Sequence, residues 1–298
     1  GTPYRSNNEF LFKCPYCDHH KRKFSVNVAK GYYKCWVCDT RGKNIYRVIR
    51  RFGSNHDKAQ WREFTDAVDF DKLEDLFAEK IEEKQILEMP EGFISLANRE
   101  MPPTGFAAMN YLRHRGITKQ DIVWWKMGYC TKGEYEGRII IPSFDDEGDL
   151  SYFVSRSYDR SYYPKYKNPP ASRNIIFNDL FVDWSSDIIL VEGIFDAINA
   201  GRNAVPILGS TLNQNSVLLR KIVKEDAGVY VALDPDATKK ELEIIKTLLD
   251  FDIEVWKVNL GDNEDVGSME KGQFQKCLEN ATLITSDNYL LLTLAMSV

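Results

Sequence analysis

Two pairs of cysteines near the N-terminus constrain this part of the chain most. Cys14 and Cys17 form the first pair, Cys35 and Cys38 form the second, and 17 residues separate the pairs. Each pair fits a tight turn that directs two thiolates at one tetrahedral ion, which is the spacing of a zinc ribbon. Four thiolate ligands close the coordination shell, so we expect a structural zinc. A module of about 40 residues cannot build a core alone, so metal binding and folding should be coupled.

Basic and aromatic residues surround these cysteines. Residues 1–51 contain 12 of the 39 basic residues (Lys and Arg) but only 3 of the 44 acidic residues (Asp and Glu). The rest of the chain contains 27 basic and 41 acidic residues. The net charge of −5 therefore divides into +9 and −14. Cations beside aromatic rings suit single-stranded nucleic acid, although charge also serves solubility alone. Trp36 is expected in the small core of the ribbon, and His19 and His20 are expected outside the metal shell.

The length of 298 residues, 43% of them apolar, allows one large domain or two to three smaller ones. The longest apolar run, around Tyr289 to Met296, is far shorter than the roughly 20 residues that span a bilayer. No signal peptide opens the chain. We therefore expect no membrane association and a cytoplasmic location, with the six cysteines as metal ligands or buried thiols.

A regular alternation of strand and helix patterns runs from Asp187 to Leu260. The expected strands are 187–191, 204–208, 229–233 and 253–258, and the expected helices are 194–200, 213–223 and 239–249. This βαβαβαβ order implies a largely parallel sheet with helices on both faces. The fold class predicted for this part is therefore α/β.

Three acidic residues follow two of these strands. Glu192 follows the first strand, and Asp234 and Asp236 follow the third. Open parallel sheets place their ligand sites at the carboxyl ends of strands, so the three carboxylates could converge. Converging acids need a cation, and oxygen ligands favour Mg²⁺ or Mn²⁺, which activate a hydroxyl and steady the leaving oxygens in phosphoryl transfer. Each turn alone is ordinary, but both on one sheet favour a metal site.

The middle of the chain has a less regular pattern. Residues 45–52 are expected to form a short basic helix, 57–88 are charge-dense with helical spacing, further helices are expected at 109–115 and 118–126, and strands at 138–142 and 151–155. From Arg156 to Arg173 the chain carries five cations against Asp159. This stretch is either a solvated loop or an anion-binding segment.

Several segments together carry a resemblance. Val191-Glu192-Gly193, followed about forty residues later by Asp234-Pro235-Asp236, resembles the Toprim signature of DnaG-type primases, topoisomerases and some nucleases. Further segments resemble the primases in particular, and in their order: 14–52 with Phe24-Ser25-Val26, Tyr111 to Thr118, Arg138 to Pro142, Ser155-Arg156, Pro164 to Asn168 and Asn263 to Met269. The resemblance implies a β zinc ribbon followed by a mixed α+β primase core that contains a Toprim-like parallel βαβ sheet.

The resemblance also implies a division of the chain and a set of site residues. The parts would be a zinc-binding ribbon at 1–52, a helical linker at 53–88, the N-terminal part of an RNA polymerase core at 89–183, a Toprim catalytic subdomain at 184–270 and a C-terminal tail at 271–298. The catalytic residues would be Glu192, Asp234, Asp236 and Asp265, the first three as magnesium ligands. The residues that bind nucleotide or template would be Arg138, Arg156, Lys165 and Asn168.

The chain departs from the family pattern at three positions. Cys17 stands where bacterial primases usually have His, which points to the four-cysteine variety typical of phage primases. Lys239 replaces a frequent glycine, and Gly267 replaces the second acid of the last motif, which weakens the case for Asp265. The expected sheet ends about forty residues before the chain does, so we expect no helicase-binding domain. The apolar end, 288–298, is expected to pack on the core or to contact a partner.

The resemblance implies a DNA primase, which makes short RNA primers on single-stranded DNA by metal-dependent nucleotidyl transfer. Its partners would be the template, ribonucleoside triphosphates, a separate replicative helicase and a single-stranded DNA-binding protein. A Toprim nuclease is one alternative, but it leaves the ribbon and the basic motifs unexplained. A non-catalytic DNA-binding recombination mediator is another, but it has no use for three clustered acids. A topoisomerase would need a nucleophilic tyrosine on a further domain.

Overall fold

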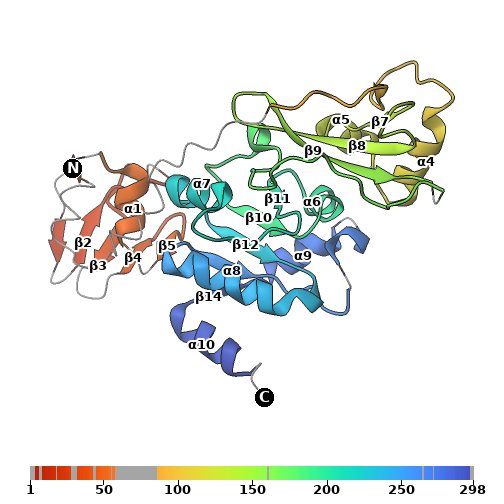
Figure 1. The fold of residues 1–298 in the computed structure, drawn as a ribbon. Helices are drawn as coiled ribbons and strands as arrows, with labels where there is room; N and C mark the ends of the chain where they lie inside the picture. The colour runs from red at the N-terminus through yellow and green to blue at the C-terminus, as the bar shows by residue number, and fades with distance from the viewer. Residues whose placement is uncertain are drawn as a thin grey trace. The chain divides into compact units, whose positions relative to one another are not determined.

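The computed structural model describes residues 4–6, 9–17, 19–27, 32–42, 45–54, 56–57, 86–159, 161–263, 265–270 and 272–295. The chain divides into two compact units, Gly1–Phe77 and Ala78–Val298, and each is described by itself (Figure 1). Most of the predicted linker, 53–88, lies outside the described residues. The division into five parts therefore stays a prediction.

The N-terminal unit is a five-stranded antiparallel sheet with one helix. In sheet order its strands are β1 (Tyr4–Ser6), β2 (Glu9–Phe12), β3 (Phe24–Asn27), β4 (Tyr32–Cys35) and β5 (Arg41–Gly42). The helix α1 (Ile45–Phe52) has the predicted bounds. The small core of this unit lies on one face of β3 and β4, where the rings of Phe24 and Tyr33 are 5.4 Å apart.

The prediction that Trp36 belongs to this core is wrong. The strand β4 ends with the buried Cys35, and because side chains alternate along a strand, the next one points outward. Trp36 is 66% exposed, and the ammonium group of Lys34 lies 4.7 Å from its ring centroid. Phe24 and Tyr33 form the core instead because both lie on the buried face of the paired strands.

The C-terminal unit begins with a four-stranded antiparallel sheet. Its strands, in sheet order, are β6 (Phe93–Ser95), β7 (Gly128–Cys130), β8 (Arg138–Phe144) and β9 (Leu150–Ser157). Two helices, α4 (Gly105–His114) and α5 (Lys119–Trp124), connect β6 to β7. A capping box starts α5: the backbone N–H of Thr118 donates to Asp121 at 2.8 Å, and Asp121 N–H donates to the Thr118 hydroxyl at 3.2 Å. The strands and helices predicted here are confirmed, with shifted ends.

The second sheet of this unit has the predicted βαβ alternation. Along the chain its elements are β10 (Ile188–Val191), α6 (Ile194–Ala200), β11 (Ala204–Pro206), α7 (Val217–Glu225), β12 (Val229–Ala232), α8 (Thr238–Asp250) and β13 (Val255–Lys257). These four strands are parallel and lie in the order β11-β10-β12-β13. The fold class, a β zinc-ribbon sheet followed by a mixed core with a parallel βαβ sheet, is confirmed.

The C-terminal segment adds a strand that the sequence analysis did not predict. After α9 (Gln273–Glu279), β14 (Thr282–Ile284) pairs antiparallel with β13, so the expectation that the sheet ends near residue 258 is wrong. Ile284 is buried opposite Val255, which gives this edge strand its apolar contact. The last helix, α10 (Ser286–Ala295), lies against α8, where the Tyr289 hydroxyl donates to the Leu242 carbonyl at 3.4 Å. Among the described residues, no helix is long and apolar enough to cross a membrane.

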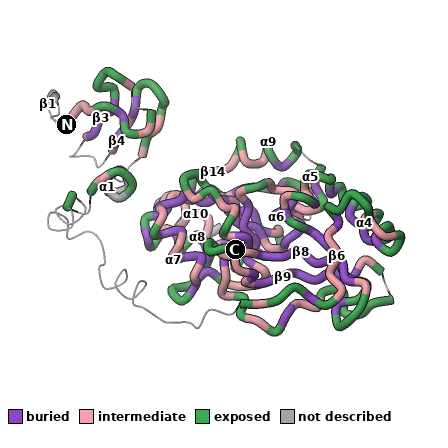
Figure 2. The backbone as a smooth tube through the Cα atoms, turned by 90° about the horizontal axis from the view of Figure 1, so that it is seen from above, coloured by how far each residue is buried: buried purple, intermediate pink, exposed green. Residues whose placement is uncertain are grey.

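One apolar core joins the two sheets of the C-terminal unit. Figure 2 shows the buried stretches of β8 and β9, which contribute to it. It contains Ile139 and Val154 from the first sheet, Val191 from the second, and Phe195 and Ile198 from α6. The cluster fixes the antiparallel sheet against α6, the helix that follows Glu192. Side chains from β8 and β9 are thereby held close to the carboxyl edge of the parallel sheet.

Candidate active site

The four cysteines of the N-terminal unit converge as predicted. Cys14, Cys17, Cys35 and Cys38 offer sulfur atoms that all lie within 4.8 Å of one another. The Sγ atoms of Cys14 and Cys38 are 3.7 Å apart, and those of Cys17 and Cys35 are 3.9 Å apart. Four sulfurs at about 2.3 Å from a tetrahedral zinc ion would be separated by about 3.8 Å. The cluster therefore has the dimensions of a closed structural zinc site.

The charge state of the Cys14 thiol would depend on the metal. Burial raises the pKa of the Cys14 thiol to about 12, so this side chain would be protonated at neutral pH without a metal. A zinc ion holds its cysteine ligands as thiolates. The ring centroids of His19 and His20 are 4.4 Å apart and the rings are tilted by 32°. Neither histidine belongs to the cysteine cluster, as predicted.

Three predicted carboxylates converge at the carboxyl edge of the parallel sheet. Glu192 directly follows β10, Asp234 lies two residues after β12, and Asp236 lies in the short 3₁₀ helix η2 (Pro235–Ala237). Each offers an oxygen within 4.8 Å of the other two. The convergence arises because β10 and β12 are adjacent and parallel, so their carboxyl ends meet at one edge.

Asp234 is the most perturbed of these acids. Its Oδ1 atom is buried and accepts no hydrogen bond within the described structure. Burial, followed by the negative charges of Asp196, Glu192 and Asp265, raises the pKa of Asp234 to about 7. A half-buried carboxylate with an unpaired, buried oxygen and other acids around it is suited to a divalent cation.

Sequence reasoning missed Asp196, which organises this edge. It lies in the first turn of α6, and its carboxylate accepts the backbone N–H of Gly193 at 2.8 Å and that of Gly267 at 2.9 Å. Burial is the main cause that raises the pKa of Asp196. Its position one helical turn after Glu192 could have indicated a role at the site. An acid in the first turn of a helix is also common for helix capping alone, so the position was not specific.

The same contact explains the departure at Gly267. A Cβ atom on this residue would lie 2.7 Å from the Asp196 carboxylate, so a side chain cannot fit without displacing it. The predicted Asp265 stands two residues earlier and caps the 3₁₀ helix η3 (Val266–Ser268) by accepting the Ser268 N–H at 2.6 Å. Its charge contributes to the raised pKa of Asp234, although Asp265 does not belong to the group of three.

One lysine, also missed by sequence reasoning, enters the acidic cluster. The Nζ atom of Lys240, on α8, lies 2.9 Å from Oε1 of Glu192, and both side chains are largely buried. The neighbouring Lys239 is exposed. The pair joins residues 48 positions apart, so no local pattern could reveal it.

Two predicted arginines are buried without full hydrogen bonding. Arg138, at the start of β8, is 3% exposed, and its Nη1 atom has no partner among the described residues. Burial lowers the pKa of its guanidinium below the ordinary value. Arg156, on β9, donates to the Tyr166 hydroxyl at 2.5 Å and lies 5.4 Å from the ring of Phe195, the residue before Asp196. Buried cationic donors of this kind are available to an anionic ligand.

The remaining two predicted residues lie in the loop after β9 and differ in their contacts. Lys165 is exposed, and its carbonyl accepts the Ser157 N–H at 3.0 Å, which holds the loop beside β9. The Oδ1 atom of Asn168 accepts the Ser155 N–H at 3.1 Å, so this side chain supports the backbone. A further cation, Arg115 directly after α4, lies 4.5 Å from the Phe195 ring and was not predicted.

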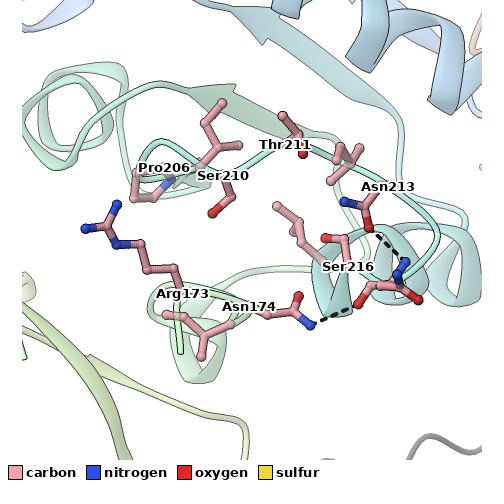
Figure 3. A pocket seen from close by; sticks show the side chains of 12 residues that line it. Arg173, Asn174, Pro206, Ser210, Thr211, Asn213 and Ser216 are labelled. Carbon is pink, nitrogen blue, oxygen red and sulfur yellow. Dashed lines mark hydrogen bonds between the residues drawn. The ribbon is translucent and has the colours of Figure 1, made fainter. Parts of the chain in front are cut away.

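A cavity of about 300 Å³ opens at the carboxyl end of β11, next to the acidic edge (Figure 3). The loop that lines it begins beside Glu192, whose carbonyl accepts the Leu208 N–H at 3.0 Å. Arg173 lines it opposite Ser210, and Asn174 braces its wall by accepting the Val217 N–H at 2.9 Å. The lining mixes uncharged polar side chains with apolar ones, among them Ile175, Pro206 and Leu212, and Arg173 is the one charged residue among the described residues that line it.

Comparisons with known proteins agree on one family. Residues 4–83 match the sequence model described as the CHC2 zinc finger. The DNA primase of Helicobacter pylori (strain J99) is 26% identical over 282 residues, which cover 78% of this chain and 48% of the relative. The DNA primase of Mycoplasma genitalium is 23% identical over 346 residues and covers 91% of this chain and 56% of the relative. The chain thus spans about half the length of the curated relatives it matches.

Solved structures share the fold. The crystal structure of the zinc-binding and RNA polymerase domains of the Aquifex aeolicus primase covers 95% of this chain and 81% of its own, with a TM-score of 0.51 and 20% identity. A DnaG primase catalytic domain bound to single-stranded DNA covers 66% and 78%, with a TM-score of 0.54 and 19% identity. The resemblance drawn from the sequence is therefore confirmed: the chain is similar to the DnaG-type primases along most of its length, with a zinc ribbon at its N-terminus and the fold of their polymerase domain behind it.

Proposed function

We propose that this chain is a DNA primase, which synthesises short RNA primers on single-stranded DNA during replication by metal-dependent nucleotidyl transfer. The observation that carries the proposal is the group of three carboxylates, Glu192, Asp234 and Asp236, within 4.8 Å at the carboxyl edge of a parallel sheet. This group occurs in a chain that is similar to DNA primases over most of its length. In the reaction, the 3′ hydroxyl of one nucleotide attacks the α-phosphate of the next, and pyrophosphate leaves.

The acidic cluster is suited to hold Mg²⁺ or Mn²⁺ through Glu192, Asp234 and Asp236, with Asp265 close by. Such an ion activates the attacking hydroxyl and neutralises charge on the phosphate oxygens. The fit is supported by the unpaired, buried Oδ1 of Asp234, which is an oxygen ligand without a partner in the described structure. Asp196 holds the backbone of this edge in place through Gly193 and Gly267.

The basic side chains of the first sheet would hold the anionic parts of the substrates. Arg138 presents a buried guanidinium with an unpaired nitrogen, and Arg156 reaches the start of α6, next to Asp196. Both can donate to phosphate oxygens in a partly desolvated setting, where charge-assisted hydrogen bonds are strong. Lys165 is exposed on the loop after β9 and is better placed to meet the template backbone. Asn168 would act through the backbone of β9.

The cavity beside Glu192 would receive part of a nucleotide. Its uncharged polar lining offers hydrogen bonds to a base or ribose, and Pro206 and Ile207 offer an apolar surface. Arg173 adds the charge that a phosphate group needs. A volume of about 300 Å³ is at the lower end of small-molecule sites.

The N-terminal unit would bind the single-stranded template. Its zinc ribbon exposes Trp36 beside Lys34, a combination of stacking ring and cation that suits unpaired bases. We further propose ribonucleoside triphosphates as substrates and a separate replicative helicase and a single-stranded DNA-binding protein as partners. These proposals follow from the likeness to primases, as does a cytoplasmic place of action. The phage origin stays a prediction.

The decisive experiment incubates the zinc-loaded chain with single-stranded DNA, Mg²⁺ and labelled ribonucleotides, with and without a replicative helicase, and sizes the products. A primase yields short labelled oligomers that require both template and ribonucleotides. Shortened input DNA without new RNA would indicate a Toprim nuclease instead. DNA binding without either product, unchanged by Asp234→Ala, would indicate the recombination mediator.

A further inference from the structure

A second hollow in the C-terminal unit lies on another side of α4 from the residues that approach α6. Phe106, Met109 and Arg113 line it, and their spacing of three and four residues puts them on one side of the helix. Tyr111, whose ring lies 5.9 Å from the Arg156 guanidinium, is on roughly the opposite side of the same helix. Arg115, directly after the helix, lies next to the Phe195 ring on that side. The hollow is therefore separate from the acidic edge.

This hollow, which we call the α4–α5 groove, has a volume of about 610 Å³. Its walls come from α4, from α5 and from the loop that follows β6. The apolar side chains that line it are Leu96, Met101, Phe106, Met109, Ile122 and Val123. Phe106 and Val123 are each 57% exposed, which is unusual for two large apolar residues beside one hollow. Methionine side chains adapt to irregular apolar partners.

The rim of the groove is basic, whereas the body around it is acidic. Arg99, Arg113 and Lys119 line the groove together with a single acid, Glu100. All four are exposed, and in the part of the chain that is described no ion pair involves any of the three cations. Residues 52–298 carry 27 basic against 41 acidic side chains, so the rim stands out from its surroundings. A complementary partner carries negative charge.

We propose that the α4–α5 groove binds a short acidic peptide segment of a partner protein, with one or two large apolar side chains as anchors. The anchors would fill the space between Met109 and Ile122 and cover Phe106 and Val123. Acidic side chains beside the anchors would meet the rim cations, as in other peptide-in-groove complexes. Single-stranded nucleic acid fits less well because it needs a series of stacking rings, and Phe106 is the one aromatic residue in the lining.

The test uses the full zinc-loaded chain and a fluorescein-labelled peptide of about 12 residues, some three helical turns. The peptide consists of Glu and Asp with two Phe residues four positions apart, so that both lie on one helix face. Control peptides replace the two Phe residues with Ala, or replace the acids with Gln and Asn. A labelled oligothymidylate of similar length tests the nucleic-acid reading. Binding is measured by fluorescence anisotropy.

Matched variants separate the groove from the rest of the surface. We expect Phe106→Ser to weaken peptide binding by about tenfold or more, while Leu290→Ser, at a similarly exposed apolar residue of α10, leaves it unchanged. Arg113→Glu should weaken binding by about threefold or more, and more strongly at low salt, while Lys246→Glu on α8 should have little effect. These residues are exposed, so their replacement should not disturb folding.

Three results would overturn the proposal. The first is an absence of binding at the highest soluble concentration of the peptide. The second is binding that does not change with the groove variants or with removal of the Phe anchors. The third is oligothymidylate binding that is lost in Phe106→Ser and Arg113→Glu while peptide binding persists, which would identify the groove as a nucleic-acid surface.

Discussion

Replacing Asp234 by Asn should stabilise the chain in magnesium-free buffer. The carboxylate lies among other acids, has a buried and unpaired oxygen, and has a pKa raised to about 7. Below about pH 4 this carboxyl is protonated in both the folded and the unfolded chain, and the folded state keeps its full stability. As the pH rises to about 7 the acid ionises first in the unfolded chain, so the free energy of unfolding falls, and above pH 7 the loss is complete. Asn carries no charge, so the variant escapes the loss, and its advantage should be greatest above pH 7.

The magnitude follows from the shift. About three pKa units correspond to about 4 kcal/mol, but Asp234 is partly solvated, so screening reduces the expected gain to about 1 to 2 kcal/mol. For a unit of this size that raises the unfolding midpoint by about 2 to 8 °C. Asp236→Asn is the matched control, because replacing this exposed acid should change the free energy of unfolding by less than about 0.5 kcal/mol.

Thermal unfolding followed by circular dichroism at pH 8 measures both effects. Metal-depleted buffer is needed rather than a chelator, because a chelator would also remove zinc from the ribbon. Added Mg²⁺ should raise the midpoint of the natural chain but not that of Asp234→Asn. An unchanged or lower midpoint for Asp234→Asn without magnesium would refute the reasoning that the cluster is strained by its own charge.

Three further predictions concern other parts of the structure. Lys240→Met should strengthen Mn²⁺ binding by about threefold, because Lys240 would compete with the ion for Glu192. Electron paramagnetic resonance without nucleotide measures the binding. Lys239→Met should leave it unchanged, and equal effects of the two variants would contradict this prediction. Cys35→Ser should lose zinc, measured by a colorimetric zinc assay, and should unfold the N-terminal unit. Cys277→Ser should keep its zinc. If both variants kept zinc, the predicted zinc site would be wrong. Arg138→Met should weaken nucleotide binding by about tenfold or more in a binding titration. The stability of the chain should stay equal or rise, because the substitution removes a buried, incompletely paired charge. A loss of both nucleotide binding and stability would indicate a structural role for Arg138.

Features carried by regular spacing could be predicted from the sequence. The alternation from Asp187 onward predicted a largely parallel sheet. The rule that ligands meet at the carboxyl ends of parallel strands predicted that Glu192, Asp234 and Asp236 could converge, and they do. The cysteine pairs likewise predicted a closed cluster. In each case the chemistry lies at the end of a well-patterned element, so the element fixes the position of the side chain.

Features that depend on tertiary contacts were missed. Lys240 meets Glu192 from a different helix, and Asp196 contacts Gly267 across 71 positions, so neither contact leaves a local pattern. Strand β14 is three residues long, too short for periodicity to identify it. The helix expected at 213–223 begins later, at Val217, because the Ser216 hydroxyl caps it by accepting the Leu219 N–H at 3.4 Å.

The central claim is that the acidic edge joins ribonucleotides on a template, and the products themselves test it most directly. The measurement is to sequence the short products that the zinc-loaded chain makes on a defined single-stranded DNA and to determine their 5′ ends. The account predicts RNA complementary to the template, with 5′ triphosphates, and none from the Asp234→Ala variant. DNA fragments of the template itself, or RNA whose sequence is independent of the template, would contradict it.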